Sequence, residues 1–198
     1  MRLHNKQLGF TLIEMIVSLA VFSIVITIAV GALLMLIANN KKVQNEQSVM
    51  TNLSFALDSM TREIRTGTDY YCVDSIPADA FDIDDWTGGD DCSTNGDIGI
   101  AFVEAGDSIT AGDSRIAYFY DASEQKLYRK VGGDDSQSIV SSGIEILDAD
   151  FFITGADRLT DGNTSQPSVT IRIEAQEVGG GEKTYFIQTA VTQRQLDI

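Results

Sequence analysis

Histidine is almost absent from this 198-residue sequence, and basic residues are scarce. The one histidine, His4, precedes a long apolar run, so the rest of the chain can form no Ser-His-Asp or Cys-His catalytic group and no histidine-ligated zinc site. Lys and Arg total 14 against 29 Asp and Glu, which gives a net charge of −15. Because phosphate contacts need clustered Lys and Arg, this balance argues against a nucleic-acid binder and favours a solvent-exposed soluble domain.

Cysteine is limited to Cys72 and Cys92, and their separation does not fit the paired CxxC pattern of a zinc site. In a compartment outside the cytoplasm, the two residues are expected to form a disulfide. Such a bridge would contribute about 3 kcal/mol by restricting the unfolded chain. Two unrelated buried thiols are the alternative.

A glycine-rich phosphate-binding loop is also missing, because VGGDD and EVGGGEK lack the spacing and the strand–helix context. The segment between the cysteines carries no Lys or Arg and is rich in aspartate: Asp74, Asp79, Asp82, Asp84, Asp85, Asp90 and Asp91. Calcium prefers several carboxylates, but the spacing here does not fit the EF-hand template. The weak calcium candidates are Asp82, Asp84, Asp85, Asp90 and Asp91, with Asp157, Asp161 and Asn163 weaker still. A solvated acidic loop is the alternative, and no other cofactor is expected.

Charged side chains are absent from residues 15–38. As a helix this run is about 36 Å long, enough to cross a bilayer core of about 30 Å. Arg2 and Lys6 precede it and favour a cytoplasmic N-terminus. No small-residue cleavage site of the A-x-A type follows, and the helical pattern continues, so we expect the segment to stay with the protein as an anchor.

Glu14 lies at the start of this uncharged run. A carboxylate costs about 2.5–3.5 kcal/mol at mid-depth in a bilayer and less near the interface. Glu14 therefore either lies at headgroup level, where the cost is small, or acquires a cationic partner after the chain is processed.

The stretch GFTLIE at residues 9–14, with a short basic leader before it and an apolar helix after it, resembles the class III signal of type IV pilins and pseudopilins. The resemblance implies that a membrane aspartyl peptidase cuts between Gly9 and Phe10 on the cytoplasmic side and methylates Phe10. It also implies that Glu14 pairs with the N-terminal ammonium of a neighbouring subunit. An α-amino group has a reference pKa of about 7.7–8.0, so this amine is mostly charged at neutral pH, and methylation keeps the charge.

The resemblance implies partners and a location as well. The partners are the prepilin peptidase, other pilin or pseudopilin subunits, the inner-membrane assembly platform and membrane lipid, whereas nucleic acid is not expected. The chain would span the cytoplasmic (inner) membrane once, with its head outside the cytoplasm, and then enter a pilus or pseudopilus. The expected organisation is a leader at 1–9 that is removed, a transmembrane and polymerisation helix at 10–38, an amphipathic half of the same helix at 39–66 and a β-rich head at 67–198. With the leader removed the chain has no histidine, and no enzymatic activity is expected.

Beyond residue 38 the helix is expected to continue with an apolar stripe that packs on a sheet of the same chain. The stripe consists of Val43, Met50, Leu53, Leu57, Met60 and Ile64. Gly67 is expected to end the helix.

The remaining segments predict strands. Residues 115–120 and 126–131 flank the turn DASEQ, and Val169, Ile171 and Ile173 alternate with polar residues. A turn at 179–181 leads into a strand at 183–192. Within 144–153 the apolar phase changes between Ile146 and Leu147, which indicates a bulge. The predicted fold class is α+β, with one long N-terminal helix packed on an antiparallel sheet, as in pilins.

The segments RIAYFYDASEQKLYRKV, SGIEILDADFFITG and PSVTIRIEAQ, with the closing FIQTAVTQRQ, resemble the J-type minor pseudopilins of type II secretion and the PilW-like minor pilins. The predicted function is therefore that of a structural subunit, a minor pilin or pseudopilin in the initiation or tip complex of a filament. The alternatives are a major pilin, a signal-anchored exported binding or enzymatic domain, and a calcium-dependent adhesin.

Overall fold

The structure, a computed structural model, describes residues 9–75, 89–107, 112–157, 162–179 and 183–194. It divides into two compact units, Met1–Asn45 and Glu46–Ile198. Helix α1 (Leu12–Thr66) belongs to both units. Every other helix and strand of the described residues lies in the second unit, which we call the head unit.

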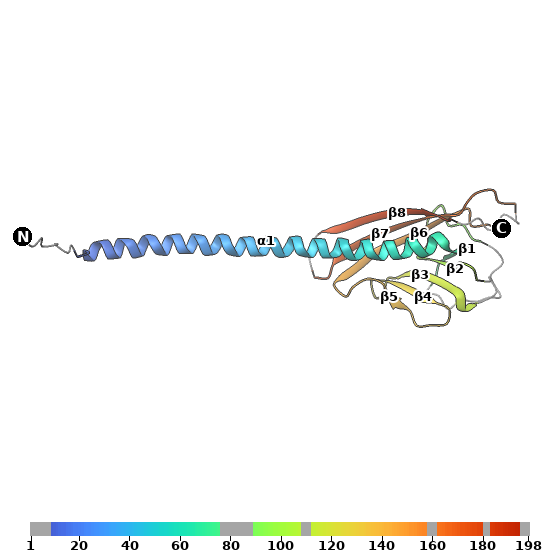
Figure 1. Cartoon of the computed structure of the whole chain (residues 1–198), viewed down its shortest axis with the longest axis horizontal. Coiled ribbons are helices and arrows are strands. Elements are labelled where there is room, and N and C mark those ends of the chain that lie inside the picture. The colour runs from blue at the N-terminus through green and yellow to red at the C-terminus, as the bar shows by residue number, and fades with distance from the viewer. Residues whose placement is uncertain (1–8, 76–88, 108–111, 158–161, 180–182, 195–198) are drawn as a thin grey trace, which may run out of the picture. The chain divides into compact units, whose positions relative to one another are not determined.

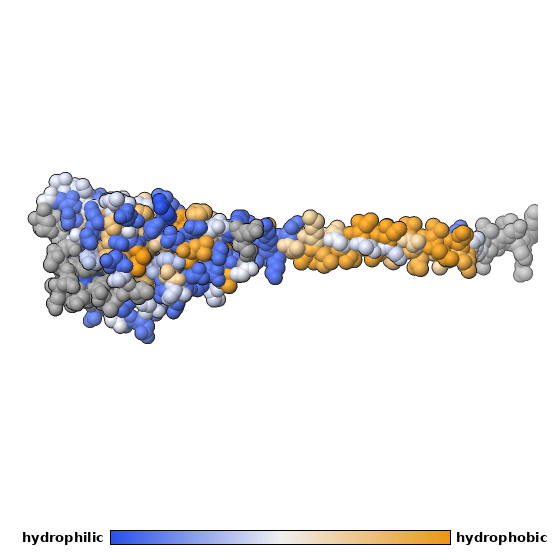
Figure 2. All heavy atoms as spheres, turned by 180° about the vertical axis from the view of Figure 1, so that it is seen from behind, coloured by the Kyte–Doolittle hydropathy of each residue, from blue (hydrophilic) through white to orange (hydrophobic). Residues whose placement is uncertain are grey.

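The first part of α1, residues 12–38, is largely apolar, and its side chains are exposed. By length and composition the helix could cross a membrane, and none of its most apolar stretch is buried within the protein. Figure 2 shows apolar side chains over most of the visible surface of this part, whereas the visible surface of the head unit is largely polar. The exposed apolar surface supports a membrane anchor, because a helix that is apolar on all sides requires an apolar environment.

Within the head unit, α1 buries one face against both sheets (Figure 1). The buried helix residues are Val49, Leu53, Ala56, Leu57, Met60 and Ile64. The predicted stripe is thus right from Leu53 onward and wrong for its first two members, since Val43 is 51% exposed and Met50 is 42% exposed. Two residues seven positions apart differ in direction by about 20° around a helix. Ile64, Leu57, Met50 and Val43 are spaced by seven, so each earlier member of this series points further from the buried face.

The helix ends at Thr66, directly before Gly67 as predicted, although the reason differs. Gly67 does not take up the left-handed conformation, which is found instead at Asp69 (φ 52°). A Cβ at Gly67 would lie 2.4 Å from the ring of Phe102, so this position needs glycine for close packing. The hydroxyl of Tyr70 lies 2.6 Å from the Ile64 carbonyl oxygen and supplies a donor to the last turn.

The head unit contains two antiparallel sheets where the sequence predicted one (Figure 1). The five-stranded sheet has the order β1-β2-β3-β4-β5, and the three-stranded sheet has the order β6-β7-β8. The first sheet consists of β1 (Thr68–Val73), β2 (Gly99–Val103), β3 (Arg115–Asp121), β4 (Lys126–Val131) and β5 (Gln137–Ser138), with a short 3-10 helix at Gly112–Ser114. The second consists of β6 (Ile144–Thr154), β7 (Ser168–Glu177) and β8 (Thr184–Thr192).

Several predicted strand features are confirmed. Strands β3 and β4 form the predicted hairpin, and β7 alternates buried and more exposed residues. The predicted bulge is present, because the β6–β7 register shifts between Ile146 and Asp148. One feature that the pattern did not predict is a bridge between Asp97 and Phe151, whose two backbone hydrogen bonds of 2.9 and 2.8 Å attach the loop before β2 to β6.

A partly buried polar cluster connects α1 with the five-stranded sheet. Glu63 on the helix accepts hydrogen bonds from the Tyr118 hydroxyl on β3 at 2.7 Å and from Arg129 Nε on β4 at 2.9 Å. Burial and the hydrogen bond to the carboxylate raise the pKa of Tyr118. The cluster fixes the helix at one orientation on the sheet, because its hydrogen bonds are directional whereas apolar packing is not.

Candidate functional site

The predicted processing site lies immediately before the first turn of α1. Gly9 and Phe10 are outside the helix, and Phe10 is 85% exposed. Apart from its neighbours in the chain, no described residue has an atom within 4 Å of a Cβ placed on Gly9. The Gly9–Phe10 bond is therefore accessible to another protein, and nothing in the fold itself requires glycine at this position.

Thr11 and Glu14 form a capping box around the start of α1. Glu14 Oε2 accepts hydrogen bonds from the backbone N–H and the hydroxyl of Thr11, both at 2.8 Å. In return, the Glu14 backbone N–H donates to Thr11 Oγ1 at 3.4 Å. Two backbone donors that the first turn leaves without helical partners are satisfied in this way, and the carboxylate lies where the helix dipole favours negative charge.

The capping box is the functional feature that the interpretation of the sequence missed. Thr11, with Glu14 three residues later and an apolar run behind it, fits the T-x-x-E signature of a helix start. From the sequence, Glu14 is expected either at headgroup level or beside a cation acquired after processing, and not in a hydrogen bond within its own chain. In the structure, the carboxylate already has two donors within its own chain. Glu14 is therefore held in a defined position next to Phe10 before any partner arrives.

Hydroxyl groups further along the apolar helix bond within the helix as well. Ser18 donates to the Glu14 carbonyl oxygen at 2.6 Å, Ser23 to that of Leu19 at 2.8 Å, and Thr27 to that of Ser23 at 2.8 Å. These bonds satisfy the hydroxyl donors, which lowers the cost of placing the side chains in lipid. Their presence is consistent with a helix that crosses a membrane.

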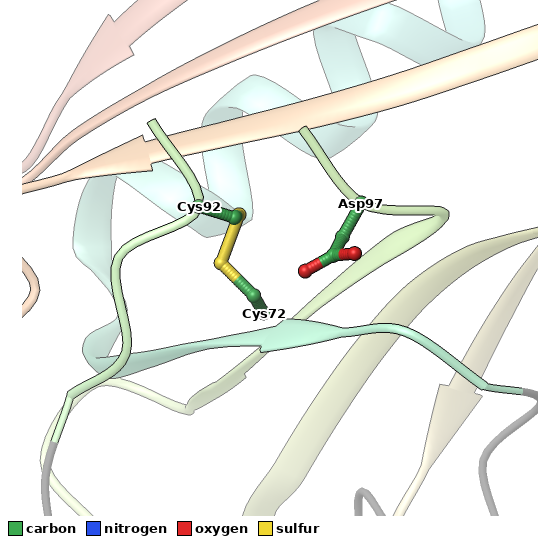
Figure 3. A group of neighbouring side chains, drawn as sticks. All are labelled: Cys72, Cys92 and Asp97. Carbon is green, nitrogen blue, oxygen red and sulfur yellow. A yellow bond between two sulfur atoms is a disulfide. The ribbon is translucent and has the colours of Figure 1, made fainter. Parts of the chain in front are cut away.

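The predicted disulfide between Cys72 and Cys92 is present, with its Cα atoms 6.0 Å apart (Figure 3). The carboxylate of Asp97 lies near the bridge, and its nearest oxygen is within 4.8 Å of both sulfurs. These three side chains are not a metal site, because sulfurs joined in a disulfide carry no thiolate charge to ligate a metal. Asp97 alone would remain as an anionic ligand.

Of the acidic candidates for calcium, Asp90 and Asp91 lie within the described residues, while Asp82, Asp84 and Asp85 lie outside them. The Asp91 carboxylate accepts hydrogen bonds from the backbone N–H groups of Gly155 at 3.0 Å and Ala156 at 2.8 Å. Its role in the structure is therefore to attach the acidic segment to the loop after β6.

Two further candidates behave similarly. The Asp90 backbone N–H donates to the Tyr70 carbonyl oxygen at 3.2 Å, which holds the segment against β1. The side-chain amide of Asn163 donates toward the carbonyl oxygens of Gly155, Asp157 and Ser165 at 2.7–3.2 Å. Asp161 lies outside the described residues. These bonds are typical of loop anchoring.

The pKa of Asp97 is raised above its ordinary value, first by burial and then by repulsion from Asp74 and Asp90. A raised pKa in the folded state means that the charged form opposes folding once the pH exceeds the unfolded value of about 3.9. We expect Asp97→Asn to raise the melting temperature of the full chain in detergent by a few degrees at pH 7. The gain should shrink as the pH falls through about 3.9 and vanish below about pH 3, where the carboxyl is protonated in both states.

The control for this change is Asp107→Asn, which removes one acidic charge at an exposed position. Melting curves followed by circular dichroism across the pH range provide the measurement. An equal gain in both variants would show that the effect comes from the total charge of the chain and not from the surroundings of Asp97.

Comparison with known protein families gives a match at the N-terminal end of the chain. Residues 4–30 match the family described as the prokaryotic N-terminal methylation motif, and the match includes Gly9, Phe10, Thr11 and Glu14. It supports a type IV pilin-like or pseudopilin subunit with a prepilin-type signal, processed by a prepilin peptidase and assembled with other pilins. No curated protein and no solved structure matches the chain.

Proposed function

We propose that the protein is a minor pilin or pseudopilin that is cut between Gly9 and Phe10, methylated at Phe10 and inserted into a filament. The observation that carries the proposal is the match to the methylation motif at residues 4–30, a range that contains the expected cleavage bond and the start of the capped, apolar helix α1. Residues 10–38 anchor the chain in the cytoplasmic membrane, and the head is extracytoplasmic. The disulfide supports this location, because such bridges persist outside the reducing cytoplasm.

Assembly then depends on the carboxylate of Glu14. Cleavage creates a charged amine on Phe10, one residue before the capping box. In the bilayer, an ammonium from a neighbouring subunit and the Glu14 carboxylate neutralise each other, which lowers the cost of both charges in lipid. The position of Glu14 is set in advance by Thr11, so little side-chain entropy is lost when the pair forms.

The head is assigned to the class of J-type minor pseudopilins and PilW-like minor pilins. The subunit is proposed to act in the initiation or tip complex of the filament. The β3–β4 hairpin, whose strands read RIAYFYD and KLYRKV, and the long closing strand β8 support this assignment. A major pilin is the alternative within the same class, and the number of copies per filament distinguishes the two.

The processing step is tested with the full chain, expressed with and without a prepilin peptidase. We expect the peptidase to yield a product that begins at methylated Phe10, identified by its intact mass and its N-terminal peptide. Gly9→Val should abolish the cut. Because a Cβ at Gly9 meets no described residue other than its neighbours in the chain, the loss would come from the fit of the cleavage site to the peptidase.

Gly31→Val is the matched control for that experiment. Gly31 lies inside the same helix and also has open space around its Cα, so valine there should leave the cut unchanged. If Met1 persists in the wild-type chain while the peptidase is active on a known substrate, the helix is a tether and the protein is an anchored exported domain.

A further inference from the structure

Strand β8 forms one edge of the three-stranded sheet in the head unit (Figure 1). Its sequence, TYFIQTAVT, contains no charged residue, proline or glycine. It pairs with β7 from Ser168↔Thr192 to Gln176↔Thr184 without a register shift. Edge strands are normally protected from added strands by charges, proline, bulges or short length. None of these protections is present in β8.

The outward-facing main-chain groups of β8 can be assigned from one hydrogen bond. The backbone N–H of Gln193 donates to the Pro167 carbonyl oxygen at 3.0 Å, so odd-numbered residues face β7. The even-numbered residues, Thr184, Phe186, Gln188, Ala190 and Thr192, therefore direct their N–H and C=O groups away from the sheet. In the part of the chain that the structure describes, none of these groups bonds to another segment.

The side chains along the same edge are open as well. Phe186 is 71% exposed, and Gln188, Ala190 and Thr192 are also exposed. A strand added here would gain main-chain hydrogen bonds and would cover an aromatic ring that is otherwise in water. Because β8 offers no charge to pair with, a charged residue opposite its centre would gain no ion pair, whereas an apolar residue there would cover the exposed ring of Phe186. The incoming strand is therefore uncharged along its centre.

One cationic residue flanks each end of β8. Lys183, at the start, bonds to Glu46 at 2.9 Å. At the other end, the backbone N–H of Arg194 donates to the Arg65 carbonyl oxygen at 2.8 Å, so the two arginines are adjacent. Both are exposed, and neither guanidinium has an ion pair among the residues described. In a chain of net charge −15, this is a local site for a carboxylate.

We propose that the edge of β8 binds an extended, uncharged segment of another filament subunit, with a carboxylate of that segment beside Arg65 and Arg194. The proposal rests on the function proposed above. A second copy of this chain paired in parallel does not fit, because its Arg194 would face Arg194 of the first, and like charges directly opposite each other destabilise a strand pair.

Residue-resolved amide hydrogen exchange of the full processed chain tests the proposal, first in detergent micelles and then in assembled filaments. We expect the amides of Thr184, Phe186, Gln188, Ala190 and Thr192 to exchange at least about tenfold more slowly in the filament. The odd-numbered amides, already bonded to β7, should change little. Protection that rises equally at odd and even positions would overturn the proposal, because it would indicate burial of a face without strand addition.

Gln188→Pro removes one outward N–H and leaves the bonds to β7 intact, since proline is tolerated at an edge position whose N–H faces solvent. Gln188→Thr keeps the N–H and serves as the control. We expect the proline variant to be cut and methylated normally, to melt like the wild type, and to enter filaments at least about tenfold less than the threonine variant. Arg194→Glu, which places a carboxylate next to the incoming one, should also reduce incorporation.

The outcomes separate this proposal from the proposed function. A wild-type chain that is neither cut nor incorporated overturns both. A chain that is cut and incorporated, with unchanged β8 amides and normal incorporation of Gln188→Pro, overturns strand addition alone. A photo-crosslink from position 188 to a second copy of this chain would also overturn the assignment of the partner.

Discussion

Replacing Glu14 with alanine is expected to leave the chain cut and methylated but to lower its incorporation into filaments by about tenfold to a hundredfold. The cut depends on Gly9 and Phe10, which are outside the helix and unaffected by the change. In the proposed assembly, incorporation depends on a hydrogen bond between the Glu14 carboxylate and the ammonium of a neighbouring subunit, and a hydrogen bond to a charged group contributes about 1.5–3 kcal/mol. The ratio of chain in sheared filaments to chain in membranes provides the measurement.

Two further variants separate the charge of Glu14 from its role in the capping box. Glu14→Gln keeps a carbonyl oxygen that can complete the box but removes the charge, whereas Thr11→Val removes the hydroxyl and keeps the charge. If the charge drives assembly, the glutamine variant should fail like alanine. Thr11→Val should then lose incorporation only in part. Normal incorporation of Glu14→Gln would show that capping of the helix, and not neutralisation of an amine, is what the carboxylate supplies.

Met60→Ala is expected to destabilise the head unit by about 2–5 kcal/mol, the range for methionine truncation in a packed core. Met60 is fully buried in the core that the helix shares with the sheets, so alanine there removes packed side-chain volume and leaves a cavity. Chemical denaturation of the full chain in detergent, followed by near-ultraviolet circular dichroism, measures the loss.

Met50→Ala is the matched control, because it makes the same substitution on the same helix at a position that is 42% exposed. The expected change in unfolding free energy is within about 0.5 kcal/mol. Equal losses for the two methionines would contradict the orientation of α1 on the sheets, and therefore the burial of the Leu53–Ile64 face.

The sequence predicted the helix and several strands well because each has a strong local pattern. The apolar run at 15–38, the alternation in β7 and the phase change at Leu147 each depend on neighbouring residues alone. The error at Val43 and Met50 has a geometric cause, since spacing by sevens drifts around a helix and does not show where the sheets begin to cover it.

The division of the strands into two sheets could not be predicted in the same way. A period of two shows which face of a strand is buried but not which strand is its neighbour, because pairing joins residues distant in sequence. The Asp97–Phe151 bridge and the contact of Glu63 with Tyr118 and Arg129 are of this kind. The fixed position of Glu14 was predictable in principle, because the T-x-x-E signature is local and was present in the sequence.

The attachment of the acidic segment has a consequence for engineering. The disulfide holds the ends of residues 72–92 with their Cα atoms 6.0 Å apart, and Asp91 attaches the second end to the loop after β6. With both ends fixed, the closure entropy of the segment costs only about 0.6 kcal/mol more for each doubling of its length. An epitope or affinity tag inserted between the cysteines is therefore expected to cost the head unit little in closure entropy.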